Sequence, residues 1–112
     1  MARTTNLGEL EQLILLAVLR LGDDAYGVTI RAELSNRARR AVAPGALYTA
    51  LERLETKGFV GSRMGDPTPQ RGGRAKRYVK VTAAGLKALK RAQHAFDRLA
   101  DGLNQLRGKH AH

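Results

Sequence analysis

The spacing of apolar residues along this chain changes at Gly58. Before that glycine, apolar residues recur at steps of three and four, which is the spacing of one helix face. After it come two short segments of alternating or β-branched character, joined by a long loop with glycines and prolines, and helical spacing returns from Thr82. The pattern predicts a mainly helical α+β fold in the order helix, helix, helix, strand, strand, helix.

Local signals set the expected boundaries of these elements. Asn6 with Glu9 resembles a capping box, and Gly22 is a helix stop. Pro44 is tolerated in the first turn of a helix, and Gly58 ends that same helix. We therefore expect helices at about 7–21, 25–36 and 44–57, strands at about 59–64 and 76–81, a last helix at 83–107 and a flexible tail at 108–112.

This order is the layout of a winged helix-turn-helix module, so we expect residues 1–82 to form a DNA-binding domain. In such a module the third helix enters the major groove, and the hairpin, called the wing, lies against the flanking backbone. A groove helix needs small or hydrogen-bonding side chains to approach base edges. The third helix offers Gly45, Ala46 and Thr49 of this kind, and also Arg53 and Lys57, which either contact DNA or pair with Glu52 and Glu55.

The positive charge of the chain is concentrated in the same region. The 112 residues hold 20 Lys and Arg against 10 Asp and Glu, a net charge of +10 that favours a polyanionic partner. No acid lies between Asp66 and Asp97, a stretch with eight cations. Basic loop residues either contact DNA phosphates or are solvated surface charges. The candidates are Arg71, Arg74, Lys76 and Arg77 in the wing, with Arg37, Arg39 and Arg40 before the third helix.

Other classes of function lack the residues they need. The chain has no cysteine, its two serines lie outside any nucleophile turn, and its three histidines form no metal-binding pattern. We therefore expect no enzyme activity, no cofactor and no metal. The longest apolar run, Leu13–Leu19, is too short to span a bilayer, so we expect a cytoplasmic protein with no membrane partner.

Four motifs, in this order, carry a family resemblance. They are Asp24-Ala25-Tyr26-Gly27, Gly45-Ala46-Leu47-Tyr48-Thr49-Ala50-Leu51-Glu52-Arg53-Leu54-Glu55, Gly72-Gly73-Arg74-Ala75-Lys76-Arg77-Tyr78 and Val81-Thr82-Ala83-Ala84-Gly85. Over about residues 7–106 the chain resembles the PadR family of bacterial transcriptional regulators. Two features depart from the family pattern: Ala75 stands where the wing often has a proline, and the wing tip is longer.

The resemblance implies a homodimeric, nucleoid-associated repressor that binds double-stranded DNA at a pseudo-palindromic operator. It also implies that Tyr26 and Tyr48 lie near the DNA backbone or in the core. The last helix packs against its mate in such proteins, and the first helix assists. The interface residues expected on this basis are Leu10, Leu13, Leu89, Phe96, Leu99, Leu103 and Leu106.

Phe96 has two interpretations. It is either a core residue of the dimer interface or, with Ala92, part of a pore that stacks on a small planar hydrophobic effector, as ligand-responsive relatives suggest. Two other functions are alternatives for the whole chain: a winged-helix module that binds protein, or a small basic RNA-binding protein. Only five residues are aromatic, which argues against a stacking surface for single-stranded RNA.

Overall fold

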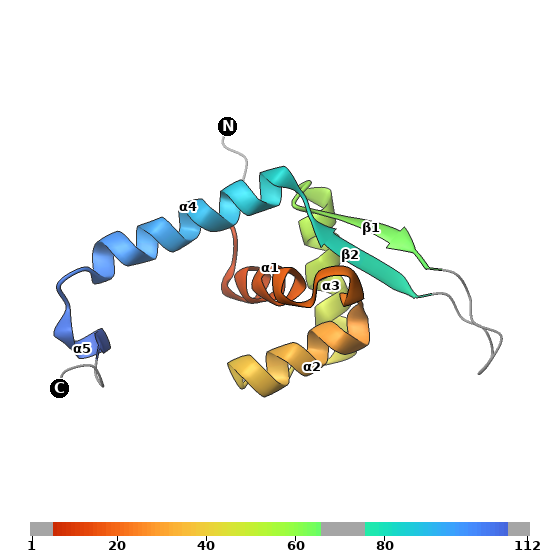
Figure 1. The fold of residues 1–112 in the computed structure, drawn as a ribbon, viewed down its shortest axis with the longest axis horizontal. Helices are drawn as coiled ribbons and strands as arrows, with labels where there is room; N and C mark the ends of the chain where they lie inside the picture. Colours follow the sequence, from red (N-terminus) through yellow and green to blue (C-terminus); the bar gives the residue numbers. More distant parts are fainter. Residues whose placement is uncertain (1–5, 66–75, 108–112) are drawn as a thin grey trace.

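The computed structural model describes residues 6–65 and 76–107 (Figure 1). Its elements confirm the predicted mainly helical α+β fold with a two-stranded antiparallel sheet. In chain order they are α1 (Glu9–Leu21), the 3-10 turn η1 (Gly22–Asp24), α2 (Gly27–Ala38), α3 (Pro44–Thr56), β1 (Val60–Met64), β2 (Arg77–Val81), α4 (Ala83–Ala100) and α5 (Asn104–Arg107).

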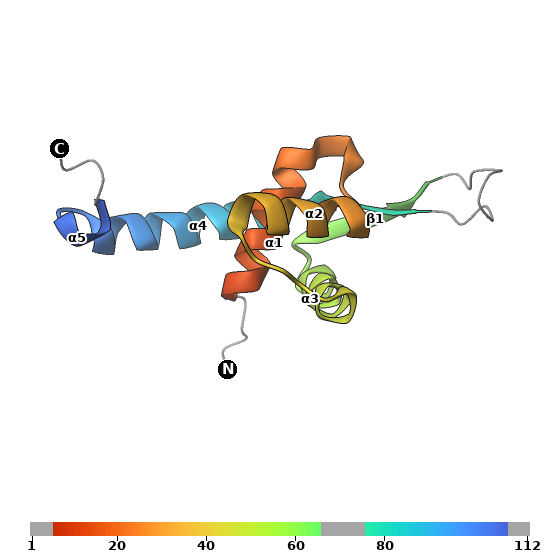
Figure 2. The same cartoon turned by 90° about the horizontal axis from the view of Figure 1, so that it is seen from below.

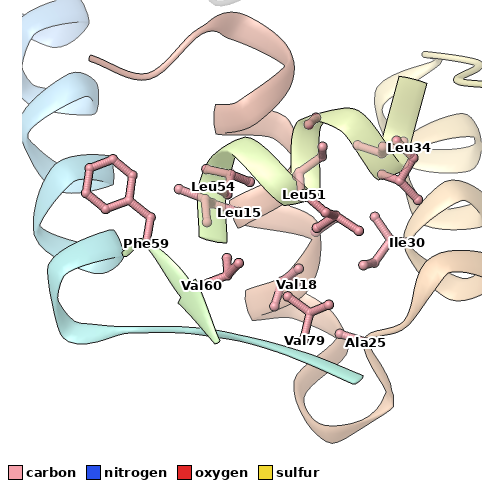
Figure 3. Close-up of a cluster of buried hydrophobic side chains, with 14 of the residues drawn as sticks. Leu15, Val18, Ala25, Ile30, Leu34, Leu51, Leu54, Phe59, Val60 and Val79 are labelled. Carbon is pink, nitrogen blue, oxygen red and sulfur yellow. The ribbon is translucent and has the colours of Figure 1, made fainter. Parts of the chain in front are cut away.

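The core lies between the first three helices and the hairpin (Figure 3). Its fully buried large side chains come from all three helices, and Phe59, Val60 and Val79 close the side that faces the strands. The strands leave this body on one side and α4 leaves it on the other, as Figure 1 shows. The large fully buried side chains are Ile14, Leu15, Ile30, Leu34, Leu47 and Leu54.

The hairpin is fixed to the helices at its base. β1 and β2 pair from Val60 opposite Val81 to Met64 opposite Arg77. The residues before α2 also pair with β2, because Tyr26 forms an isolated β-bridge with Tyr78 and the N–H of Val79 donates to the carbonyl of Ala25 at 2.9 Å. The base of the wing and the start of α2 are therefore one unit.

The start of α4 is fixed by the turn between α3 and β1. The Thr82 hydroxyl accepts from the N–H of Gly85 at 3.0 Å and donates to the carbonyl of Gly58 at 2.6 Å. The N–H of Thr82 donates to the carbonyl of Phe59 at 3.0 Å. The backbone of Phe59 passes so close to Gly85 that a Cβ there would overlap the Phe59 carbonyl oxygen. Only glycine therefore fits at this point of α4.

The last helix differs from the prediction of one helix over 83–107. It ends at Ala100, and α5 begins only at Asn104, because Gly102 takes a φ of 81°, which a helix does not allow. The predicted flexible tail, 108–112, lies outside the described residues.

Two helix starts also differ from their predicted positions. α1 begins at Glu9 with Gly8 as its cap, and the carboxylate that accepts from the Gly8 N–H at 2.8 Å belongs to Glu11, so the predicted pairing of Asn6 with Glu9 is wrong. α2 begins at Gly27 because Tyr26 is extended and pairs with β2. Within 6–65 and 76–107 no helix has both the length and the apolar character needed to cross a membrane.

Candidate nucleic-acid interface

α3 turns a face of small and polar side chains to solvent. The apolar stripe of Leu47, Ala50, Leu51 and Leu54 is buried, so the opposite side of the helix points outward. Figure 2 shows α3 end-on, at the edge of the body. The predicted DNA-contacting residues that are exposed on this helix are Gly45, Ala46, Tyr48, Thr49 and Arg53.

A groove runs along one side of α3. It has a volume of about 520 Å³, and its walls are the start of α1 and the side of α3 that carries Ala46, Thr49 and Arg53. Arg53 forms no ion pair with any residue that the structure describes, so the alternative pairing with Glu52 or Glu55 is not observed there. Its guanidinium is available to a ligand along this groove.

Lys57 is placed differently from the prediction of a DNA contact. Its ammonium donates to both carboxylate oxygens of Glu11, at 2.9 and 3.0 Å, and to the carbonyl of Asn6 at 2.9 Å. Glu11 is buried and the Lys57 side chain is only 20% exposed. All three donors are used inside the protein. We therefore leave Lys57 out of the candidate interface and assign it to the attachment of α3 to α1.

Two tyrosines lie near the start of α2. Tyr48 extends from α3 toward Gly27, the first residue of α2: a Cβ atom placed on that glycine would lie 4.0 Å from the Tyr48 hydroxyl oxygen. More than half of Tyr48 is exposed. Tyr26 is the residue before α2, and its N–H donates to the Thr29 hydroxyl at 3.0 Å. Tyr48 thus presents its hydroxyl at the positive end of a helix, where anions such as phosphates are favoured.

Tyr26 and Tyr78 hold two cations at the base of the wing. Their rings meet edge to face with centroids 5.4 Å apart. The Lys76 ammonium lies 4.7 Å from the centre of the Tyr26 ring, and the Arg63 guanidinium lies 4.6 Å from the centre of the Tyr78 ring. Arg63 was not among the residues predicted from the sequence to contact DNA. Arg63 lies in the first predicted strand and Tyr78 in the second, and the two residues are direct partners in the register. Pairing the two predicted strands as a hairpin was the signal that could have pointed to Arg63.

Arg77 joins the wing to α3. Its guanidinium pairs with the carboxylate of Glu55, which also accepts from the Ser62 hydroxyl at 3.2 Å. Arg77 therefore mainly fixes the wing relative to α3, and part of its charge is already neutralised by Glu55. Arg71 and Arg74, the other predicted wing contacts, lie outside the described residues.

The basic group before α3 is divided among different contacts. Arg37 pairs with Glu33 at 2.9 Å, and Arg40 pairs with Glu9 at 3.5 Å. Arg39 is exposed and takes a left-handed φ of 55°, which ends α2. Of these three candidates, Arg39 is thus free of ion pairs within the described part of the chain, whereas Arg37 and Arg40 are not.

The predicted interface residues divide into two groups. Leu89 is buried in the core of the protomer, so its assignment to a dimer interface is wrong, and Leu10 and Leu13 are half-buried against the same core. The four residues further along the chain all expose their side chains, with Leu99 at 82%. These exposed residues are Phe96, Leu99, Leu103 and Leu106.

Ala92, the second predicted effector residue, lines a shallow groove of about 320 Å³ between α4 and the residues before α1. Phe96 is not among the residues that line it, although Ala95 and Arg98 are, so the groove follows a different side of α4 from Phe96. Among the residues that the structure places, no three His, Asp or Glu side chains are grouped closely enough to hold a metal ion.

Comparisons with known proteins agree with this geometry. The model of the transcriptional regulator PadR-like family matches residues 15–91. The chain is 38% identical over 80 residues to the transcriptional regulator Rv3488 of Mycobacterium tuberculosis, which covers 70% of this chain and 68% of that protein. It is similar to the crystal structure of a PadR family transcription regulator from Clostridium difficile, with a TM-score of 0.72, 25% identity, and coverage of 90% of this chain and all of that one. A transcriptional regulator from Clostridium thermocellum has the same fold, with a TM-score of 0.70, 23% identity, and coverage of 86% and 87%.

Proposed function

Because this chain belongs to the PadR-like family of transcriptional regulators, and is therefore a regulator and not an enzyme, we propose that it is a DNA-binding repressor. It binds a pseudo-palindromic operator as a homodimer in the cytoplasm, with two copies of α3 in successive major grooves about 34 Å apart. The observation that carries the proposal is the outward face of α3, which exposes small side chains, together with a wing whose Lys76 and Arg63 are held over tyrosine rings.

The contacts of the wing support this function. Lys76 and Arg63 are held over tyrosine rings, and Arg77 is held to α3 by Glu55. Cations that are already oriented lose less side-chain entropy when they meet phosphates. The wing base and α3 therefore approach a duplex as one rigid surface.

Salt titration tests the electrostatic part of the proposal. We expect the logarithm of the affinity for a selected duplex to fall linearly with the logarithm of the salt concentration, with a slope of roughly 0.9 per phosphate contact. Arg53→Ala and Lys76→Ala should each lower that slope by roughly 1.8 per dimer, because each removes one contact from both protomers. Fluorescence anisotropy at several salt concentrations gives the slopes.

The matched control for this titration is Lys90→Ala, which removes an exposed cation from α4. Its slope should equal that of the unmodified protein. A salt-insensitive complex would contradict the proposal. Failure to retain any duplex at low salt would favour the protein-binding module, and preference for single-stranded RNA would favour the RNA-binding protein.

An uncovered apolar face supports the homodimer. The face of α4 that starts in the core with Gly85, Ala88 and Leu89 continues at helical spacing as the half-buried Ala92 and the exposed Phe96 and Leu99. Apolar side chains in such a row are typical of an interface.

Leu99→Glu should convert the dimer to a monomer, because a carboxylate at the centre of a helix-helix contact would be buried without a partner. We expect sedimentation to give the mass of one protomer, and affinity for the full palindrome to fall about 100-fold or more, since the two half-sites are then bound separately. Val28→Glu is the matched control for the sedimentation measurement, because Val28 is also exposed but lies on α2. A dimer that survives Leu99→Glu would contradict this interface. Binding of a planar effector at Phe96 and Ala92 stays a prediction.

A further inference from the structure

Glu52 lies at the centre of the outward face of α3. Successive residues of a helix are rotated by about 100°, so residues four, three and four apart share one side. Gly45, Thr49, Glu52 and Thr56 have this spacing, and all are exposed. The buried stripe of Leu47 to Leu54 is on the opposite side. If α3 enters a groove, the Glu52 carboxylate is therefore aimed at its floor.

Glu52 differs from the other acids near α3 because it has no partner among the described residues. Glu55, one turn away on the side of the wing, forms an ion pair with Arg77 and accepts a hydrogen bond from Ser62. Glu11 takes Lys57. Glu52 forms neither an ion pair nor a side-chain hydrogen bond with any of the residues in 6–65 and 76–107.

An unpartnered carboxylate on a surface that contacts DNA must accept hydrogen bonds from donors on the DNA, or it lowers the affinity of the protein for DNA. A carboxylate only accepts hydrogen bonds, and phosphates offer it none. The floor of the major groove offers two kinds of donor, the amino groups of cytosine N4 and adenine N6, whereas guanine O6 and N7 and thymine O4 repel a carboxylate. Such repulsion excludes the wrong bases as effectively as attraction selects the right one.

Cytosine fits this carboxylate better than adenine does. The adenine amino group lies beside the acceptor N7, which would face the second carboxylate oxygen, whereas the cytosine amino group lies beside the apolar C5–H. The neighbours of Glu52 on the same face, Thr49 and Thr56, are short and leave room for a glutamate side chain to extend into the groove.

We propose that Glu52 is a specificity-determining residue that accepts a hydrogen bond from the N4 amino group of one cytosine in each half-site. The inference rests on the proposed function, because it requires α3 to lie in the major groove. It adds a base preference to that function, and it assigns this preference to a residue that charge alone would exclude from a DNA-binding surface.

Selection from a random duplex library, followed by sequencing, tests the inference. For the unmodified protein we expect one position of each half-site to be cytosine, with about a tenfold preference over the other bases. In Glu52→Gln the preference should shift toward adenine, because glutamine pairs with N6 and N7 together. In Glu52→Ala it should disappear at that position alone, while affinity for unrelated duplex rises.

Glu55→Gln is the matched control, because it removes the same charge from the same helix one turn away. It is expected to keep the cytosine preference even if overall affinity changes. Glu52 variants that select the same sequence as the unmodified protein would overturn the inference and leave the proposed function standing. If the unmodified protein selects no sequence at all, the proposed function fails first.

Discussion

Gly85→Ala is expected to destabilise the protein by about 3–5 kcal/mol, although alanine is normally the better residue in a helix by about 1 kcal/mol. The new Cβ would overlap the carbonyl oxygen of Phe59 and lie 2.9 Å from its carbonyl carbon. Both atoms belong to the backbone, so no side chain can move to make room. α4 must shift away from the turn, and the hydrogen bonds of Thr82 to Gly58 and Gly85 are then lost.

Thermal unfolding at a fixed protomer concentration measures this effect, and the midpoint should fall by more than about 10 °C. Gly61→Ala is the matched control, because a Cβ at Gly61 would meet no atom within 4 Å. That substitution should change stability by less than about 0.5 kcal/mol. If Gly85→Ala were as stable as the unmodified protein, the close packing of α4 against the α3–β1 turn would be refuted.

The order of the elements could be predicted because each depends on neighbours in sequence. The stripe of Leu47, Leu51 and Leu54 repeats within one helix and therefore identifies both the buried side of α3 and the side that faces outward. The start of α2 could not be found in the same way. Ala25 and Tyr26 are extended because they pair with β2, about 50 residues later, and this pairing overrides the local signal of the two preceding aspartates.

In the candidate site, too, the features set by local spacing could be predicted and those set by distant contacts could not. Gly45, Ala46 and Thr49 were predicted from their side-chain type and their position on the third helix, and they are exposed as expected. Leu89 has the spacing of the exposed Phe96 and Leu99, but it is buried because the body of the protein covers only the first part of α4. Which part of an amphipathic helix is covered depends on where the other elements end, and local spacing carries no information about that.

Lys57→Met is expected to lower the free energy of unfolding by about 2–4 kcal/mol, because it leaves the buried carboxylate of Glu11 without its counter-ion. The N–H of Gly8 remains as a donor to Glu11 and limits the loss. Chemical denaturation measures the change. The matched control is Arg40→Met, which breaks the exposed pair with Glu9 and should cost less than about 1 kcal/mol.

The double variant Glu11→Gln with Lys57→Met distinguishes a structural lysine from a DNA-binding one. Removing both charges together leaves no unpaired buried ion, so most of the lost stability should return. If Lys57 only attaches α3 to α1, operator affinity and its salt slope should return with the stability. If Lys57 instead contacts a phosphate, the fold recovers while the slope stays lower by roughly 1.8 per dimer. The second result would restore Lys57 to the interface, whereas the first would establish the buried ion pair as the contact that sets the position of α3.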